Sequence, residues 1–159
     1  MMKAQKMSGA VALLLFLIVG LLPAQAEEDN RYVHWLTYRE ALEKGASQEV
    51  PILVHFTASH SGLCRKMKRE TYQNRKVIRY LNEHFAVTMI DVGEVPSLAR
   101  KYGVKSAPVL WFLDAQGKRL TSIEGEVGPE KMLRVAEYTS EKVYEHTDYD
   151  TWLNQRSRR

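Results

Sequence analysis

Residues 51–67 read PILVHFTASHSGLCRKM, and this stretch decides the fold. The continuous apolar and β-branched run PILVHF is typical of a strand buried on both faces in a helix-covered sheet. From Gly62 onward a helical pattern begins with the apolar residues Leu63 and Met67. The stretch also contains Cys64, the single cysteine of the chain. It therefore predicts a central strand, a short loop and a helix that opens beside a thiol.

Outward from this stretch, the chain alternates helical and extended patterns. We expect first a helix over Trp35–Lys44, capped by Thr37 and ended by Gly45, and then the strand of PILVHF. A long helix from Gly62, broken near Gln73–Asn74, should follow, and then a strand over Phe85–Asp91 and a short helix ended by Gly103. The last elements should be a strand entered through Pro108, a second strand after the turn DAQGK, and a helix opened by Gly128 and Pro129. The first two strands should be parallel, and the last two should form an antiparallel hairpin. This order predicts an α/β fold with a central mixed β-sheet flanked by helices on both faces.

The N-terminus has the pattern of a secretory signal. Lys3 and Lys6 precede an apolar run over residues 10–22, and Ala24-Gln25-Ala26 is a small-x-small cleavage pattern. We expect export with cleavage after Ala26. The alternative is a retained anchor, but the apolar run reaches only roughly 20 Å as a helix, short of the membrane's hydrocarbon core of about 30 Å. No cysteine stands where a lipoprotein would need one, so we expect no stable membrane anchor.

We expect four segments, namely a cleaved signal peptide (1–26), a flexible N-terminus (27–34), one folded domain (35–140) and a polar C-terminal tail or helix extension (141–159). Tyr149 and Trp152 in the last segment would dock either on the domain or on a partner. The formal net charge of +4 includes the two lysines of the signal, so the mature chain is only slightly basic and no nucleic-acid partner is expected. No cofactor is expected either.

Export also bears on the cysteine. Cysteines in an oxidising compartment usually come in pairs, but this chain has one. Cys64 must therefore be buried and inert, free and reactive, or paired with another molecule.

Three pieces of the chain, PILVHFTASHSGLCRKM, KYGVKSAPVLWFLDAQGK and IEGEVGPEKML, occur in the order and at the spacing of a known family. With them the chain resembles the thioredoxin superfamily over residues 35–138. It looks most like exported, periplasmic thioredoxin-like proteins, including the soluble thioredoxin domain of the transmembrane reductant relay. The resemblance implies a thioredoxin-like fold.

The resemblance also assigns positions around the cysteine. By this resemblance, Phe56 ends the family's strand and His60 takes the place of a tryptophan. Ser61 takes the place of the attacking cysteine, Gly62 and Leu63 form the spacer, and Cys64 takes the place of the resolving cysteine. Pro108, preceded by Ala107, falls on the family's cis-proline. The motif is thus a degenerate Ser-Gly-Leu-Cys. A serine hydroxyl is not ionised near neutral pH and forms no disulfide, so the usual dithiol cycle should be absent.

The resemblance places His55 where many relatives bury an acidic residue beneath the resolving cysteine. Two roles are open for His55. It would either accept the Cys64 proton and pair with the thiolate, or be a neutral core histidine bonded to a backbone carbonyl. Burial disfavours the thiolate, whereas the helix dipole and nearby cations favour it. A minor alternative is a soft-metal site made by His60 and Cys64 with His55 as a third ligand. Because two ligands are too few, we predict no metal site.

Two functions remain open. In the first, a periplasmic protein handles thiols and disulfides through a single cysteine, with Cys64, His55 and Ser61 as the catalytic set. In the second, a non-enzymatic module recognises a partner or peptide. Its contact residues, which would also hold the substrate in the first case, are His60, Gly62, Leu63, Ala107 and Pro108. The expected partners are protein thiols or extended peptide segments of exported proteins, with a membrane reductant relay as a further candidate.

Overall fold

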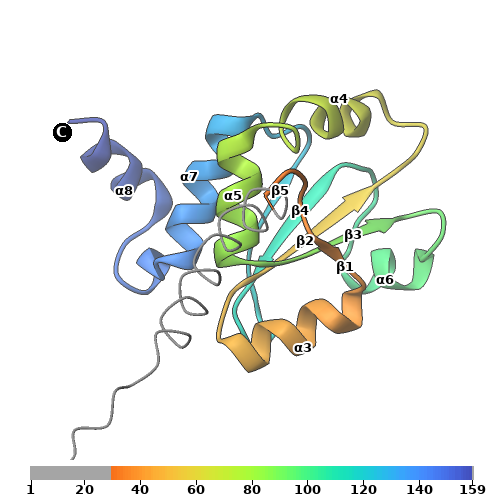
Figure 1. The fold of residues 1–159 in the computed structure, drawn as a ribbon, viewed down its shortest axis with the longest axis horizontal. Coiled ribbons are helices and arrows are strands. Elements are labelled where there is room, and N and C mark those ends of the chain that lie inside the picture. Colours follow the sequence, from red (N-terminus) through yellow and green to blue (C-terminus); the bar gives the residue numbers. More distant parts are fainter. Residues whose placement is uncertain (1–29, 159) are drawn as a thin grey trace, which may run out of the picture. The chain divides into compact units, whose positions relative to one another are not determined.

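The structure is a computed structural model that describes residues 30–158. From Tyr32 onward the chain forms one unit built on a five-stranded sheet of order β1-β3-β2-β4-β5 (Figure 1). The strands are β1 (Trp35–Leu36), β2 (Ile52–Thr57), β3 (Ala86–Asp91), β4 (Val109–Leu113) and β5 (Arg119–Glu124). The expected signal peptide, residues 1–26, lies outside the described residues.

Strand β2 is the centre of the sheet. It pairs with β3 in parallel and with β4 antiparallel, and β4 continues into β5 as an antiparallel hairpin. The expected mixed sheet is therefore confirmed, including the parallel first pair and the hairpin. Strand β1, which pairs in parallel with β3, was not expected.

Helices cover both faces of the sheet (Figure 1). They are α3 (Tyr38–Gln48), α4 (Gly62–Glu70), α5 (Arg75–His84), α6 (Pro96–Lys101), α7 (Pro129–Ser140), a 3-10 turn at Val143–Glu145 and α8 (Tyr149–Arg156). One buried cluster joins odd-numbered residues of β2, such as Leu53, to α4, α5 and α7, and the other joins even-numbered residues, such as Val54 and Phe56, to α3 and α6. The alternation of side chains along a strand explains this division. His55 therefore faces the side of α4 and α5.

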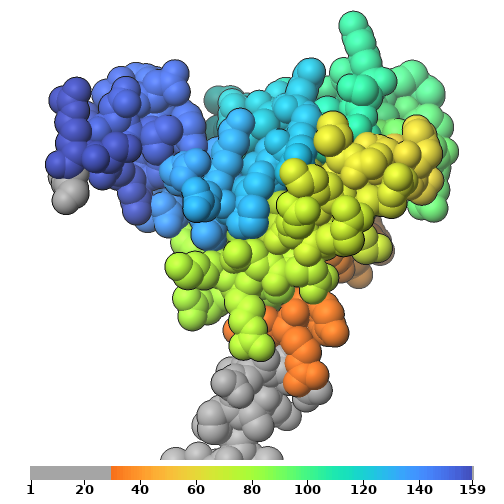
Figure 2. All heavy atoms as spheres, turned by 90° about the horizontal axis from the view of Figure 1, so that it is seen from above, coloured from red at the N-terminus to blue at the C-terminus, as the bar shows by residue number. Residues whose placement is uncertain are grey.

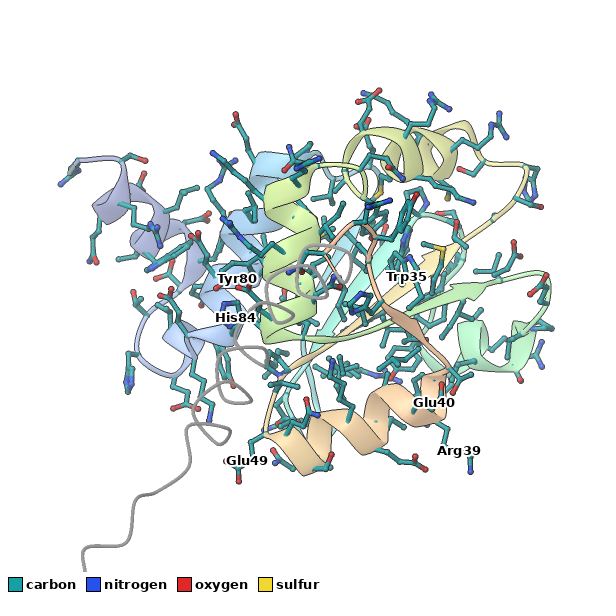
Figure 3. The ribbon with its side chains drawn as sticks, in the orientation of Figure 1. Trp35, Arg39, Glu40, Glu49, Tyr80 and His84 are labelled. Carbon is teal, nitrogen blue, oxygen red and sulfur yellow. The ribbon has the colours of Figure 1, made fainter. Side chains whose placement is uncertain are left out.

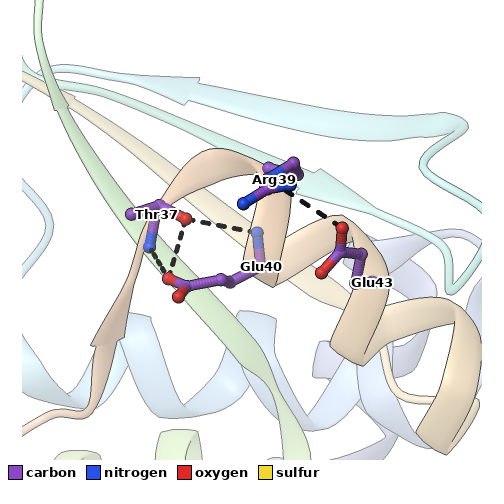
Figure 4. Close-up of polar contacts among 4 residues, drawn as sticks. All are labelled: Thr37, Arg39, Glu40 and Glu43. Atoms are coloured by element: carbon purple, nitrogen blue, oxygen red, sulfur yellow. Dashed lines mark hydrogen bonds and ion pairs between the residues drawn. The ribbon is translucent and has the colours of Figure 1, made fainter.

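Helix α3 begins at a capping box (Figure 4). The Thr37 hydroxyl accepts the Glu40 backbone N–H at 3.3 Å, and a Glu40 carboxylate oxygen accepts the Thr37 N–H at 2.8 Å. The Thr37 hydroxyl also donates to that carboxylate oxygen at 2.7 Å, and this bond, followed by the one from the Thr37 backbone N–H, lowers the pKa of Glu40. The predicted cap is confirmed, but the predicted start of the helix at Trp35 is wrong, since Trp35 and Leu36 pair with β3 before the cap.

Gly45 does not end α3, contrary to expectation. The helix continues to Gln48, and Glu49 ends it in the left-handed conformation, with φ of 55° (Glu49 is labelled in Figure 3). A Cβ at position 45 would lie 2.7 Å from two side-chain carbons of Ile52 and 3.2 Å from the Ala115 carbonyl oxygen. Gly45 is therefore required by close packing of helix against sheet, not by a turn.

The predicted break in the long helix is confirmed. Helix α4 ends at Glu70, and the Thr71 hydroxyl then donates to the Val127 carbonyl at 2.6 Å. Asn74 caps α5 by accepting the backbone N–H of Lys76 at 3.0 Å. The break leaves Tyr72 buried in the turn between the two helices.

The segment after residue 140 docks on α7. Trp152 of α8 is buried, and its ring centroid lies 5.5 Å from that of Tyr138. An ion pair of 3.0 Å joins Arg156 to Glu137 (this C-terminal part is dark blue in Figure 2). The open question about Trp152 is thereby answered, because it packs on the domain itself. No helix within residues 30–158 is both long and apolar enough to cross a membrane.

We predict that Gly45→Ala lowers the free energy of unfolding by about 1–3 kcal/mol, because the methyl group would collide with the fully buried Ile52. Urea denaturation would measure the change. The control is Gln48→Ala, an exposed position of the same helix, which should stay within about 0.5 kcal/mol of the wild type. Equal stabilities of the two variants would contradict the packing role of Gly45.

Candidate functional site around Cys64

Ser61 joins the start of α4 to the loop before β4. Its hydroxyl caps the helix by accepting the Cys64 backbone N–H at 3.3 Å, and it donates to the Ala107 carbonyl at 3.2 Å. The peptide bond from Ala107 to Pro108 is cis. The two segments that the sequence reasoning paired, residues 60–64 and 107–108, therefore lie side by side.

The residues expected to contact a partner differ in exposure. His60, Gly62 and Leu63 are exposed, with Leu63 at 49%, whereas Ala107 is half-buried and Pro108 is buried. Gly62 and Leu63 open the first turn of α4, and His60 precedes its cap, Ser61, whose hydroxyl contacts the Ala107 carbonyl. They form an accessible surface next to Cys64.

Cys64 lies in the first turn of α4 and is 4% exposed. Its thiol forms no disulfide. The backbone N–H groups of this turn and the helix dipole favour negative charge at such a position. Cys64 is therefore a shielded thiol at a helix N-terminus.

His55 projects from the middle of β2 and is 1% exposed. Within the described chain, neither of its ring nitrogens has a hydrogen-bond partner. Burial lowers the pKa of His55 from 6.5 to about 4, so the imidazole is neutral at physiological pH. His55 therefore has neither the hydrogen bond to a backbone carbonyl that was expected of a neutral core histidine nor a direct hydrogen bond to Cys64.

Two aromatic side chains enclose His55. Its ring centroid lies 5.3 Å from that of Tyr72 and 6.4 Å from that of Trp35, which is labelled in Figure 3. Trp35 meets Tyr72 edge-on at 4.9 Å. The Tyr72 hydroxyl is also buried, with no hydrogen-bond partner among residues 30–158. Burial, with a further contribution from charge on Cys64, raises the pKa of Tyr72 well above its usual value, so the hydroxyl keeps its proton.

Cys64 and His55 share a cavity of about 500 Å³. Met89 also lines it, because the β2–β3 register places Met89 directly beside His55. Its remaining lining comes from the end of β2, the loop that follows, one face of α4 and the end of β3, namely Thr57, Ala58, Ser59, Arg65, Lys68, Arg69 and Asp91. The structure thus gathers a thiol and a neutral, unpartnered imidazole around one space.

The structure does not bring His60, Cys64 and His55 together as the ligands of a soft-metal site. His60 is exposed and precedes the helix cap, whereas Cys64 is buried inside the first turn. Among residues 30–158, no group of three or more histidine, cysteine, aspartate or glutamate side chains is arranged to hold a metal ion.

The sequence patterns did not indicate Trp35, Tyr72 and Met89 as neighbours of His55. Met89 could have been found by aligning the two parallel strands in register. Trp35 and Tyr72 carried no such signal, since Trp35 was assigned to a helix and Tyr72 lies in the break between two helices.

A thiol at the start of the helix that follows the central strand, beside a cis-proline before the next antiparallel strand, defines a thioredoxin-fold protein. The chain belongs to the thioredoxin-like domain family, whose match covers residues 38–140. It is 28% identical over 108 residues to the disulfide bond reductase DsbH of Chlamydia pneumoniae, a match covering 60% of this chain and 65% of that protein. It is 32% identical over 71 residues to mouse spermatogenesis-associated protein 20, a match covering 44% of this chain and 9% of that protein.

Comparison with solved structures gives the same fold. A solved structure described as DsbH oxidoreductase superposes with a TM-score of 0.62 at 24% identity, covering 69% of this chain and 85% of that one. The chain spans slightly under two thirds of Chlamydia DsbH and a small part of the mouse protein. The thioredoxin fold and the family are therefore established.

We predict that His55 makes folding stability depend on pH. Its pKa is lower in the folded than in the unfolded state, so between about pH 6.5 and 4 the unfolded chain binds a proton that the native chain does not. Stability should fall as pH falls through this window, by on the order of 2 kcal/mol between pH 7 and pH 5. Urea denaturation at several pH values would measure it.

Two variants make this test specific. His55→Leu should abolish that part of the pH dependence, whereas His146→Gln, which changes an exposed histidine, should retain it. If the wild type and His55→Leu lose stability in parallel as pH falls, His55 is not buried in its neutral form.

Proposed function

We propose that this protein handles thiols and disulfides through the single cysteine Cys64, acting in the periplasm after removal of residues 1–26. The observation that carries the proposal is the position of Cys64, a shielded thiol in the first turn of α4 that borders a cavity. The relative DsbH is described as a disulfide bond reductase, which supports the same class of chemistry.

Ser61 determines what kind of thiol chemistry is available. Its hydroxyl occupies the place of a second thiol and is already used in the helix cap and the bond to Ala107. With one cysteine the chain cannot form an internal disulfide. The product at Cys64 is therefore a mixed disulfide that only an external thiol can resolve.

The reaction is an exchange. The Cys64 thiolate attacks one sulfur of a partner disulfide, a new sulfur–sulfur bond forms at Cys64, and the other partner sulfur leaves as a thiolate that takes a proton from water. The proposed partners are exported proteins with extended segments: their disulfides are attacked by Cys64, and protein thiols resolve the mixed disulfide. A membrane reductant relay is the proposed source of the resolving thiol.

We predict that the folded protein gains one glutathione adduct at Cys64 when it is incubated with oxidised glutathione. Intact-mass measurement would detect the adduct, and Cys64→Ser should remain unmodified. Ser61→Cys is a second comparison, because a thiol at position 61 would resolve the adduct to an internal disulfide. A wild-type protein that stays unmodified while folded would exclude the proposed function.

A second candidate is a partner-binding module that uses the surface next to Pro108. The exposed Leu63 favours it, two residues after Ser61, whose hydroxyl contacts the Ala107 carbonyl, since an apolar side chain and a backbone segment are the elements that hold an extended peptide. The contact residues would be His60, Gly62, Leu63, Ala107 and Pro108.

For this candidate we predict that Cys64→Ala binds an unfolded exported polypeptide with unchanged affinity, whereas Ala107→Glu weakens binding at least about tenfold. Fluorescence anisotropy with a labelled, cysteine-free peptide would measure both. His60→Glu should behave like Ala107→Glu. Loss of binding in Cys64→Ala with retention in Ala107→Glu would reject the binding module.

A further inference from the structure

The cavity beside Cys64 opens on a different side of β2 from Pro108. Its lining comes from β2, the loop that follows, α4 and the end of β3, with no residue from the loop of Ala107 and Pro108. Strand β4, which Pro108 precedes, lies on the opposite side of β2 from β3. A molecule that reaches Cys64 through this cavity would therefore bypass the surface where Ser61 contacts Ala107.

The outer part of this cavity is cationic. Arg65, Lys68 and Arg69 line it and are exposed, whereas His55 and Cys64 are buried at its inner end (α4 lies in the yellow-green part of the surface in Figure 2). We define these three cations as the basic rim. Such a concentration of one charge sign raises the local concentration of ligands of the opposite sign.

The basic rim has no carboxylate partner among residues 30–158. The Arg65 guanidinium donates to the Ser59 carbonyl at 3.2 Å, and Lys66 of the same helix instead pairs with Glu126 at 3.0 Å. Asp91 is the single acidic residue of the lining. Its two oxygens accept the backbone N–H groups of Ser59 and Gly93, so it joins the loop after β2 to the turn after β3.

The inner part contains a buried polar side chain whose hydrogen bonds are not made within the described residues. His55 is buried, and both its nitrogens lack a partner within the described chain although it lines the cavity. An unpaired buried polar group costs free energy that a ligand or water would recover by hydrogen bonding to it. The volume of about 500 Å³ falls within the range of small-molecule sites.

We propose that the basic rim selects small anionic disulfides, such as those of peptide thiols with free carboxylates, and guides them through the cavity to Cys64. This rests on the proposed function and adds its substrate class. The Cys64 thiolate attacks the nearer sulfur, Cys64 becomes joined to one half of the disulfide, and the other half leaves as an anionic thiolate that is protonated by water. His55 at the inner end offers hydrogen bonds to the bound half.

The test compares three disulfides of different charge, namely oxidised glutathione (anionic), bis(2-hydroxyethyl) disulfide (neutral) and cystamine (cationic). The rate of adduct formation is measured by intact mass for the folded protein and, to correct for intrinsic reactivity, for the protein in urea. We expect the folded-to-unfolded rate ratio to be at least about tenfold higher for oxidised glutathione than for cystamine, and to fall toward the neutral value at high salt.

A matched pair of variants locates the effect. Lys68→Glu with Arg69→Glu reverses two charges of the basic rim and should remove or invert the preference. Arg75→Glu with Lys76→Glu makes the same charge change at exposed positions of α5 outside the cavity lining and should keep it. Circular dichroism of both double variants would confirm that they are folded.

The outcomes separate the two proposals. Equal rate ratios for the three disulfides, or a preference that survives in the Lys68→Glu, Arg69→Glu protein, would overturn the anionic selection and leave single-cysteine chemistry intact. If no disulfide modifies the folded wild type, the proposed function fails and the inference fails with it.

Discussion

The double pairing of β2, with β3 on one side and β4 on the other, is the constraint on which the site depends. Its register places His55 opposite Met89 of β3 and Leu110 of β4. Both faces of β2 are buried, so a shift of one residue would move Leu53 and His55 to the face of α3 and α6. The cost of exchanging those two packed faces holds His55 beneath α4.

The same pairing gives Cys64 two different surroundings. On the β4 side, the Ser61 hydroxyl caps α4 and donates to the Ala107 carbonyl, so both of these hydrogen bonds serve the structure. On the β3 side, the cavity brings Cys64 and His55 to a common space below exposed cations. With a single cysteine the chain cannot form an internal disulfide, but the cavity still leads to Cys64.

Local sequence signals predicted the elements that have local causes. The buried run at β2, the cap at Thr37, the break before Asn74 and the helix after Gly128 each depend on neighbouring residues, and each was predicted. Gly45 and Trp35 were misassigned because long-range contacts decide them. Gly45 is fixed by Ile52 and Ala115, and Trp35 by pairing with Val87.

The sequence by itself determined the fold class, the position of Ser61 and Cys64 at the start of a helix, and the absence of an internal disulfide. These follow from residue types and their spacing along the chain. Only the tertiary structure decided that His55 is neutral and unpartnered, that Trp35, Tyr72 and Met89 surround it, and that the basic rim borders the cavity of Cys64. Burial, pKa and the convergence of charges depend on segments far apart in the sequence, which meet only when the sheet and its covering helices are packed together.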